Sequence, residues 1–185
     1  MKKRCCYVLT QNDMKKLYAL ATSSRDKFIA CLLYETGLRL PECAALFPED
    51  IVRDYTYRGY YIQLRNRGKL SNGGYLKTGE RTISISPLLY RVYKDYLKDR
   101  ETYIPNHSYL FINLRGKRAG HPMSLTSLQK LIQRWQAHTG LPITASIFRY
   151  THGCLYYDAT QNIERVHQRL GHTKIETSLE RYIHN

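Results

Sequence analysis

The spacing of apolar residues changes twice along this 185-residue chain, and that change constrains the fold more than any other feature. Helical spacing holds up to about residue 46 and returns after Pro87. Between these parts, β-branched and aromatic residues gather in 60–64 and 81–86, as in strands, with a turn sequence at 71–74. We therefore predict a mostly α (α+β) fold with a small antiparallel sheet near residues 50–86.

Capping and helix-breaking residues set the expected helix bounds. Thr10, with Asp13 three residues later, suits a helix start, and Ser124 suits another. Pro41 can open a short helix at its first position, and Gly140 can end a longer one. The expected helices cover 11–21, 25–35, 41–46, 87–98, 124–138, 145–158 and 163–170, with a short helix before Tyr182.

The chain is strongly basic. It has 29 Lys and Arg against 15 Asp and Glu, which gives a formal net charge of +14. Self-repulsion of this size opposes compaction, and a polyanionic partner would offset it. Nucleic acid is the first candidate, and a generic basic surface is the alternative.

Several classes of protein are disfavoured. No apolar run approaches the roughly 20 residues that span a membrane, and the basic start at Met1 lacks the apolar segment of a signal peptide. The cysteines are odd in number and lack metal-ligand spacing; they are Cys5, Cys6, Cys31, Cys43 and Cys154. We predict a cytoplasmic protein with reduced thiols, no membrane segment, no metal and no other cofactor.

Five short sequence contexts follow one another and hold groups suited to phosphoryl chemistry. They supply three cations, one imidazole and one tyrosine near the C-terminus, a set that can break a DNA phosphodiester without a metal ion. The residues are Arg39 in Thr-Gly-Leu-Arg, Lys77 in Lys-Thr-Gly-Glu-Arg-Thr, Arg149 in Phe-Arg-Tyr-Thr-His, His172 in Leu-Gly-His and Tyr182 in Arg-Tyr-Ile-His.

In this order the contexts resemble the catalytic domain of the tyrosine recombinases, the phage-integrase family. Residues 35–46 are similar to the family's first arginine motif, and 150–153 with 170–173 are similar to its second block. The resemblance runs from Leu9 to His184. It implies a site-specific recombinase that cuts and rejoins double-stranded DNA through a 3′-phosphotyrosyl intermediate, without metal or ATP, in integration, excision or inversion.

The resemblance also implies a role for each residue. Tyr182 would attack the scissile phosphate, and Arg39 and Arg149 would clamp its non-bridging oxygens with their planar guanidinium groups. His172 would hydrogen-bond the phosphate; a helix-capping histidine is the alternative. Glu42 would orient Arg39 as a supporting carboxylate, unless it faces solvent.

Lys77 would be the general acid that protonates the departing 5′ oxygen. The sequence places it on or just before a strand. Neighbouring cations are predicted to contact the DNA backbone, and they are the alternatives to Lys77: Arg65, Arg67 and Lys69.

One position departs from the family pattern. The family usually has a histidine three residues before its second motif arginine, and here that position holds Ser146. A serine can donate a hydrogen bond to phosphate but is a poor general base, so the departure bears on rate more than on mechanism. His152 lies about 240° around an ideal helix from Ser146 and is predicted to be a packing residue.

Other cations are predicted to bind DNA. Three lie in one loop, with a solvated charge run as the alternative, and two lie on the 124–138 helix, where with His138 they form a stripe suited to a major groove. These residues are Arg115, Lys117 and Arg118, then Lys130 and Arg134.

The resemblance also bears on organisation. The motifs begin close to Met1, so we expect residues 1–185 to form a single catalytic domain without the N-terminal core-binding domain of most relatives. The chain ends three residues after Tyr182, where relatives have a docking tail. We therefore predict a monomer in solution and a tetramer on paired DNA sites.

Two other functions stay open at this point. A type IB topoisomerase uses similar chemistry on one duplex, although the Leu-Gly-His and Thr-Gly-Leu-Arg contexts favour a recombinase. A catalytically weakened or inactive DNA-binding regulator on the same fold is the other alternative, supported by Ser146 and opposed by the other five groups.

Overall fold

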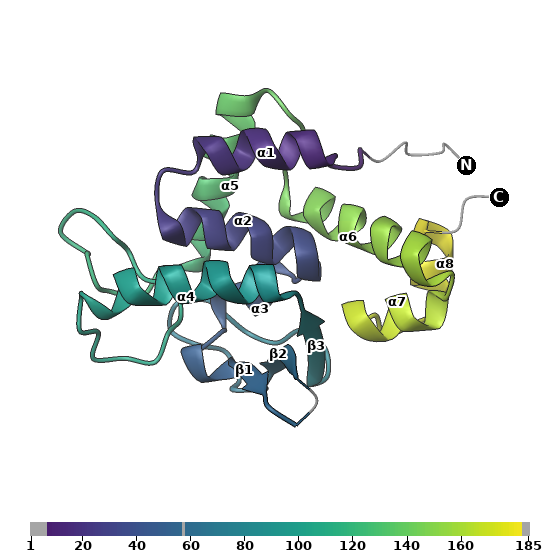
Figure 1. The fold of residues 1–185 in the computed structure, drawn as a ribbon, viewed down its shortest axis with the longest axis horizontal. Helices are drawn as coiled ribbons and strands as arrows, with labels where there is room; N and C mark the ends of the chain where they lie inside the picture. The colour runs from purple at the N-terminus through teal and green to yellow at the C-terminus, as the bar shows by residue number, and fades with distance from the viewer. Residues whose placement is uncertain (1–6, 57, 183–185) are drawn as a thin grey trace.

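The computed structural model describes residues 7–56 and 58–182, so predictions for Cys5 and Cys6 lie outside the described residues. Figure 1 shows helices at both ends of the chain and three strands between them, which confirms the predicted mostly α fold with an inserted sheet. The elements are α1 (Gln11–Leu20), α2 (Ser24–Thr36), α3 (Leu40–Ala44), η1 (Pro48–Asp50), β1 (Ile51–Asp54), β2 (Gly59–Leu64), β3 (Arg81–Ile85), α4 (Pro87–Glu101), α5 (Leu125–Thr139), α6 (Ala145–Thr160), α7 (Ile163–Leu170) and α8 (Glu176–Tyr182).

The predicted caps begin the helices as expected. The Thr10 hydroxyl accepts from the Asp13 amide at 3.1 Å and the Asp13 carboxylate accepts from the Thr10 amide at 2.9 Å, a reciprocal capping box. Ser124 caps α5, and Gly140 ends it in the left-handed conformation. Pro41 occupies the second position of α3 because the helix is capped by Arg39, so its predicted place was wrong by one residue.

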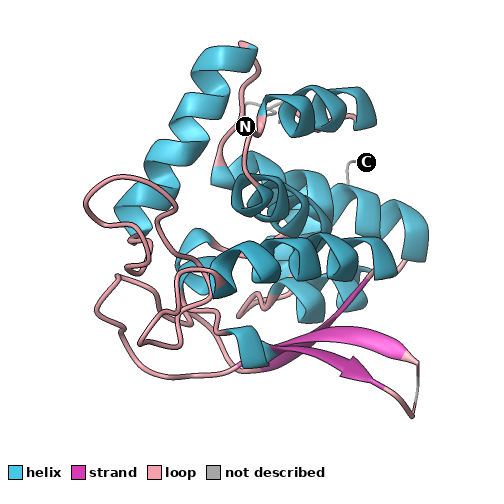
Figure 2. Cartoon of the chain, turned by 60° about the vertical axis from the view of Figure 1, so that its left-hand side comes forward, coloured by secondary structure: helices cyan, strands magenta, loops and turns pink. Residues whose placement is uncertain are grey.

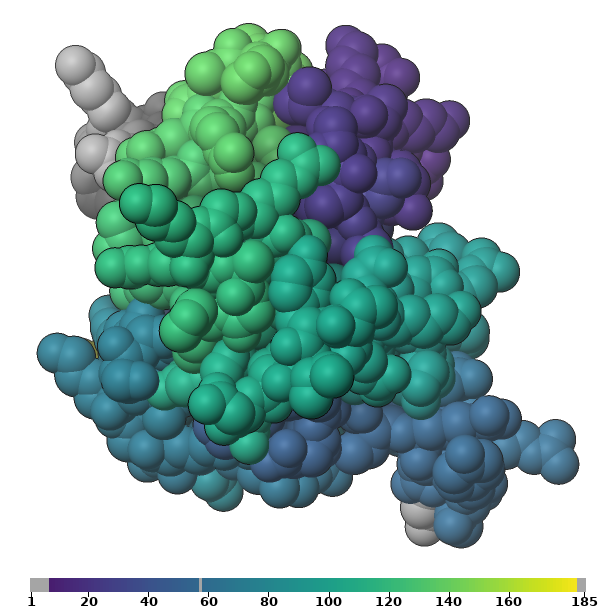
Figure 3. All heavy atoms as spheres, turned by 90° about the vertical axis from the view of Figure 1, so that its left-hand side faces the viewer, coloured from purple at the N-terminus to yellow at the C-terminus, as the bar shows by residue number. Residues whose placement is uncertain are grey.

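The three strands pair antiparallel in the order β1-β2-β3. Ile62 stands at the centre, opposite Ile51 on one side and Ile83 on the other, so a buried apolar row fixes the register. The β1–β2 hairpin projects from the body of the protein (Figures 2 and 3). Lys77 lies in the loop before β3 and not on a strand.

Helix α2 is the centre of the helical part. It packs against α1, α4 and α6, and Figure 1 shows it between α1 and α4. Its Phe28 ring lies 5.6–5.9 Å from the rings of Tyr93, Tyr96 and Phe111. Trp135 is also buried. This core fixes α3 and the start of β3 on one side of α2 and α6 on another.

The last two helices form a small second cluster at the end of α6. Val166 and Leu170 of α7 pack with Tyr182 of α8, and both helices contact α6. Among the described residues, no helix has the length and apolar character needed to cross a bilayer.

Candidate active site

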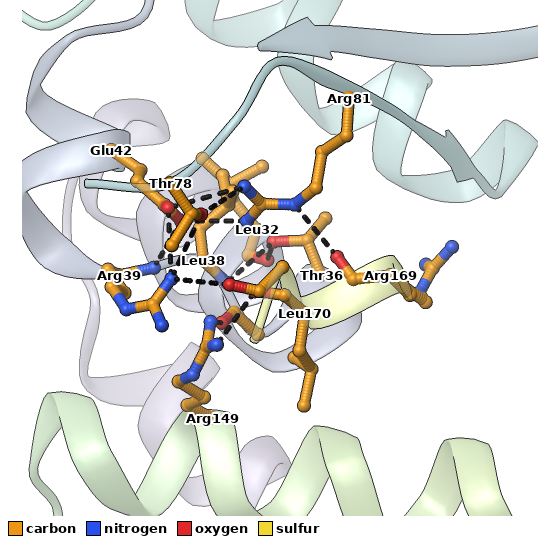
Figure 4. A network of polar contacts seen from close by, with 12 residues as sticks. Leu32, Thr36, Leu38, Arg39, Glu42, Thr78, Arg81, Arg149, Arg169 and Leu170 are labelled. Carbon is orange, nitrogen blue, oxygen red and sulfur yellow. Dashed lines mark hydrogen bonds and ion pairs between the residues drawn. The ribbon is translucent and has the colours of Figure 1, made fainter. Parts of the chain in front are cut away.

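Glu42 is a buried carboxylate shared by two arginines. It is 1% exposed and accepts from the Arg39 amide at 3.0 Å and from Arg39 Nη1 at 3.2 Å. Arg81 reaches it from β3, with Nη2 at 2.9 Å and Nη1 at 3.3 Å from its two oxygens (Figure 4). Burial acts to raise the pKa of Glu42, but the bonds and charges of Arg81 and Arg39 lower it below its ordinary value. The group does not face solvent.

Arg39 also reaches the loop that precedes His172. Its Nη1 lies 3.4 Å from the Gly171 carbonyl oxygen and 3.5 Å from Thr78 Oγ1. The Arg39 side chain stays 21% exposed, whereas the Glu42 side chain is fully covered. The guanidinium group is therefore held on its inner side and open on its outer side.

Arg149 approaches the same loop from α6. Nη1 donates to the Gly37 carbonyl at 2.8 Å and Nη2 donates to the Leu170 carbonyl at 2.7 Å (Figure 4). Burial, and then the nearby charge of Arg39, lower the pKa of Arg149 to about 10, so it remains a cation at neutral pH. Gly37 is required here, because it has φ +62° and a Cβ would lie 2.8 Å from Leu170 Cδ2.

His172 is a neutral imidazole in contact with α8. Its Nδ1 lies 2.7 Å from the Ser178 Oγ, and its ring stacks on the Tyr182 ring at a centroid distance of 6.2 Å and an interplanar angle of 3°. Burial, followed by the charges of Arg149 and Arg39, lowers the pKa of His172 to about 3.

Tyr182 is buried, with 4% of its surface exposed, and its hydroxyl makes no hydrogen bond within the described part of the chain. Burial raises the pKa of Tyr182, while the charges of Arg149 and Arg181 act in the opposite direction. The two cations therefore favour the anion of this phenol, against the effect of burial.

Gly153 makes room for this ring. A Cβ at position 153 would lie 2.3 Å from both Cε1 and Cζ of Tyr182, far inside contact distance. Gly153 follows Arg149 by one helical turn, so both residues lie on the same face of α6.

The structure brings together four of the predicted catalytic residues, Arg39, Arg149, His172 and Tyr182, with Glu42 behind them. Lys77 is exposed and stands beside Thr78, which contacts Arg39. Ser146 is exposed in the first turn of α6, one turn before Arg149.

His152 is a buried packing residue, as predicted. It is 6% exposed and accepts from Arg169 Nε at 2.9 Å. Burial, and then the Arg169 charge, lower its pKa to about 3. It takes no place in the cluster around Tyr182.

The predicted DNA-binding cations differ in exposure: Arg67 is held in an ion pair with a buried acid, and the others are exposed. Arg67 makes a bidentate ion pair with the buried Asp50, at 2.9 and 2.6 Å, and lies over the Phe47 ring. Arg65 contacts Gln63 at 2.7 Å and lies 3.8 Å from Asp50. Arg65 is exposed. The remaining cations are exposed too: Lys69, Arg115, Lys117, Arg118, Lys130 and Arg134.

Sequence reasoning missed three residues of the site. The sequence marks Arg81 only as part of the Lys77 context and as the start of a strand, marks Gly153 only as part of a motif, and gives no signal for Ser178. Arg81 could have been found in part from the sequence, because a buried acid such as Glu42 favours a second arginine as partner. Gly153 and Ser178 depend on contacts that only the fold creates.

Comparison with known proteins gives the family. Residues 7–185 match the model of the phage integrase family. The chain belongs to this family. The resemblance predicted from the five contexts is thus confirmed, and with it the catalytic-domain fold of the tyrosine recombinases.

Two curated relatives and one solved structure are similar to this chain. Transposase A from transposon Tn554 of Staphylococcus aureus is 34% identical over 185 residues, covering 100% of this chain and 50% of the relative. Tyrosine recombinase XerA of Pyrococcus horikoshii is 29% identical over 170 residues, covering 92% and 54%. The Tn1549 transposon integrase in complex with a circular intermediate DNA superposes with a TM-score of 0.76 at 20% identity, covering 99% of this chain and 63% of that one.

The chain spans about half the length of the two curated relatives. These two relatives are a transposase of a transposon and a tyrosine recombinase.

Proposed function

We propose that this chain is a DNA strand transferase in which Tyr182 attacks the scissile phosphate and forms a 3′-phosphotyrosyl bond. The observation that carries the proposal is the arrangement of Tyr182: its ring is stacked on His172, and its buried hydroxyl has no hydrogen-bond acceptor among the described residues. The charges of Arg149 and Arg181 favour the anionic form of this phenol, which suits nucleophilic catalysis.

The cluster can stabilise the charge that develops during the reaction. Arg39 and Arg149 supply planar donors for the non-bridging oxygens, and His172 supplies a neutral donor. The Tyr182 oxygen forms the new bond to phosphorus, and the bond from phosphorus to the 5′ oxygen breaks. Lys77 donates a proton to that departing oxygen, while the phenol proton passes to water.

Attack requires a movement of α8 or of the Tyr182 side chain. The hydroxyl is buried in the described structure, where a DNA phosphate cannot reach it. We propose that DNA binding shifts this equilibrium toward a state with the hydroxyl exposed. Ser146, exposed beside Arg149, then contributes a hydrogen bond but no base catalysis.

The partner in this proposal is double-stranded DNA, met in the cytoplasm. The net charge of +14 and the DNA-bound Tn1549 integrase support it. We propose a single catalytic domain that is monomeric in solution and tetrameric on paired sites, and that needs neither metal nor ATP.

A covalent-trapping assay tests the proposal. The protein is mixed with nicked duplexes taken from the DNA flanking its gene and resolved on denaturing gels. Wild type should form a protease-sensitive adduct, Tyr182→Phe should form none while still binding DNA, and Tyr55→Phe, at an exposed tyrosine, should behave as wild type.

Chelation provides a second arm. The adduct yield should not change with EDTA, because the cluster supplies its own cations. Adducts in Tyr182→Phe would remove the tyrosine from its role, and loss of activity with EDTA would contradict metal independence.

A further inference from the structure

Helix α8 holds His172 with two side chains one turn apart. Ser178 is fully buried and its Oγ lies 2.7 Å from His172 Nδ1. Tyr182, four residues later, lies with its ring parallel to the imidazole. The helix that carries the proposed nucleophile thus also determines what the imidazole can do.

The direction of the Ser178 bond follows from the serine's surroundings. Within the described residues, the Ser178 hydroxyl has one side-chain hydrogen-bond partner, His172 Nδ1. A buried hydroxyl hydrogen needs an acceptor, and Nδ1 is the one within reach. If Nδ1 accepts, the single proton of a neutral imidazole is on Nε2.

The groups around the ring keep the imidazole neutral. Burial and the charges of Arg149, Arg39 and Arg181 all disfavour a second proton, and hence a positive charge, on the imidazole. The His167 ring packs edge-on against it at a centroid distance of 6.4 Å. No described carboxylate is bonded to the ring. The choice therefore lies between two neutral tautomers, and the Ser178 hydroxyl decides it.

We propose that Ser178 is a positioning residue that holds His172 as the Nε2–H tautomer, so that the imidazole edge opposite α8 is a hydrogen-bond donor. This inference rests on the proposed function, in which that donor meets a phosphate oxygen. The other tautomer would present a lone pair to the phosphate and repel it.

The first test needs no DNA. Nitrogen-15 spectra of the histidine-labelled protein, with His172 assigned by its loss in His172→Asn, report which ring nitrogen carries the proton. Wild type should show Nε2–H, and Ser178→Thr, which keeps the hydroxyl, should match it. Ser178→Ala should give a mixture of tautomers. A wild-type Nδ1–H tautomer overturns the proposal whether or not any variant folds.

The second test measures the consequence for cleavage. Under single-turnover conditions on the nicked duplex, Ser178→Ala should form the adduct about 10–100-fold more slowly with unchanged DNA affinity, and Ser178→Thr should restore the rate. A wild-type rate in Ser178→Ala overturns the role of Ser178 and leaves the Tyr182 chemistry standing. Absence of any wild-type adduct counts against the proposed function, while the spectra still decide the tautomer.

Discussion

The Glu42 carboxylate forms ion pairs with two guanidinium groups, those of Arg39 and Arg81. A buried carboxylate without partners is very costly, and Arg81 supplies a second cation from β3. Because Arg81 satisfies much of Glu42, Arg39 keeps an open side for a phosphate. Arg81 also donates to the Arg169 carbonyl at 3.0 Å, which ties the end of α7 to the same acid.

Gly153→Ala tests how tightly Tyr182 is fitted. The added Cβ would overlap the ring, so the free energy of unfolding should fall by about 1–3 kcal/mol in urea titrations. In a Tyr182→Ala background the overlap is absent and the same change should cost little or nothing. Gly79→Ala, where a Cβ meets no atom within 4 Å, is the control. Equal losses in both backgrounds would show that the ring does not occupy this space.

The segment between β2 and β3 is anchored to η1 at its first part and carries Lys77 in its later part. Its first part closes onto η1, where Asp50 accepts from the Phe47 amide at 2.9 Å and from Arg67. In its later part, Thr78 contacts Arg39, and Lys77 remains exposed. The ion pair near η1 anchors the segment that carries the proposed general acid.

Arg67→Ala and Lys69→Ala should therefore separate stability from DNA binding. Loss of Arg67 leaves buried Asp50 without its bidentate partner, so unfolding free energy should fall by about 2–3 kcal/mol. Loss of exposed Lys69 should leave stability within about 0.5 kcal/mol. It should instead lower the slope of log affinity against log salt by about 0.9. The reverse assignment of effects would contradict a structural role for Arg67 and a DNA-binding role for Lys69.

For the whole molecule, burial of neutral imidazoles links stability to pH. The pKa of His152 is lowered to about 3 from 6.5, so as pH falls through 6.5 the unfolded chain gains a proton that the folded chain does not. Stability should therefore fall from pH 7 to pH 5, by on the order of 1–2 kcal/mol for this residue. His172 acts in the same direction.

Urea midpoints measured across this range check the sign. His152→Gln keeps an acceptor for Arg169 but removes the titration, so its stability should depend less on pH. His121→Gln, at an exposed histidine, should follow wild type. Stability that rises toward pH 5 would show that His152 is not buried as a neutral group.

Local sequence carried much of the fold. Thr10 and Ser124 mark helix starts because capping is decided within a few residues. The sequence left open whether Lys77 lies on a strand or just before one, because alternation alone does not show where pairing begins, and the structure places it before β3. Ser178 could not be found in this way, because its importance comes from a contact with His172 that only the packing of α8 creates.

The fit between Tyr182 and Gly153 also bears on how long a DNA break would last in the proposed reaction. A phenol bonded to phosphate could not also cover the α6 backbone at Gly153, so the packing of a large aromatic side chain would be lost in the proposed covalent intermediate. After rejoining, the ring would be free to return to this place. We therefore expect the resting structure to favour closed strands over open ones.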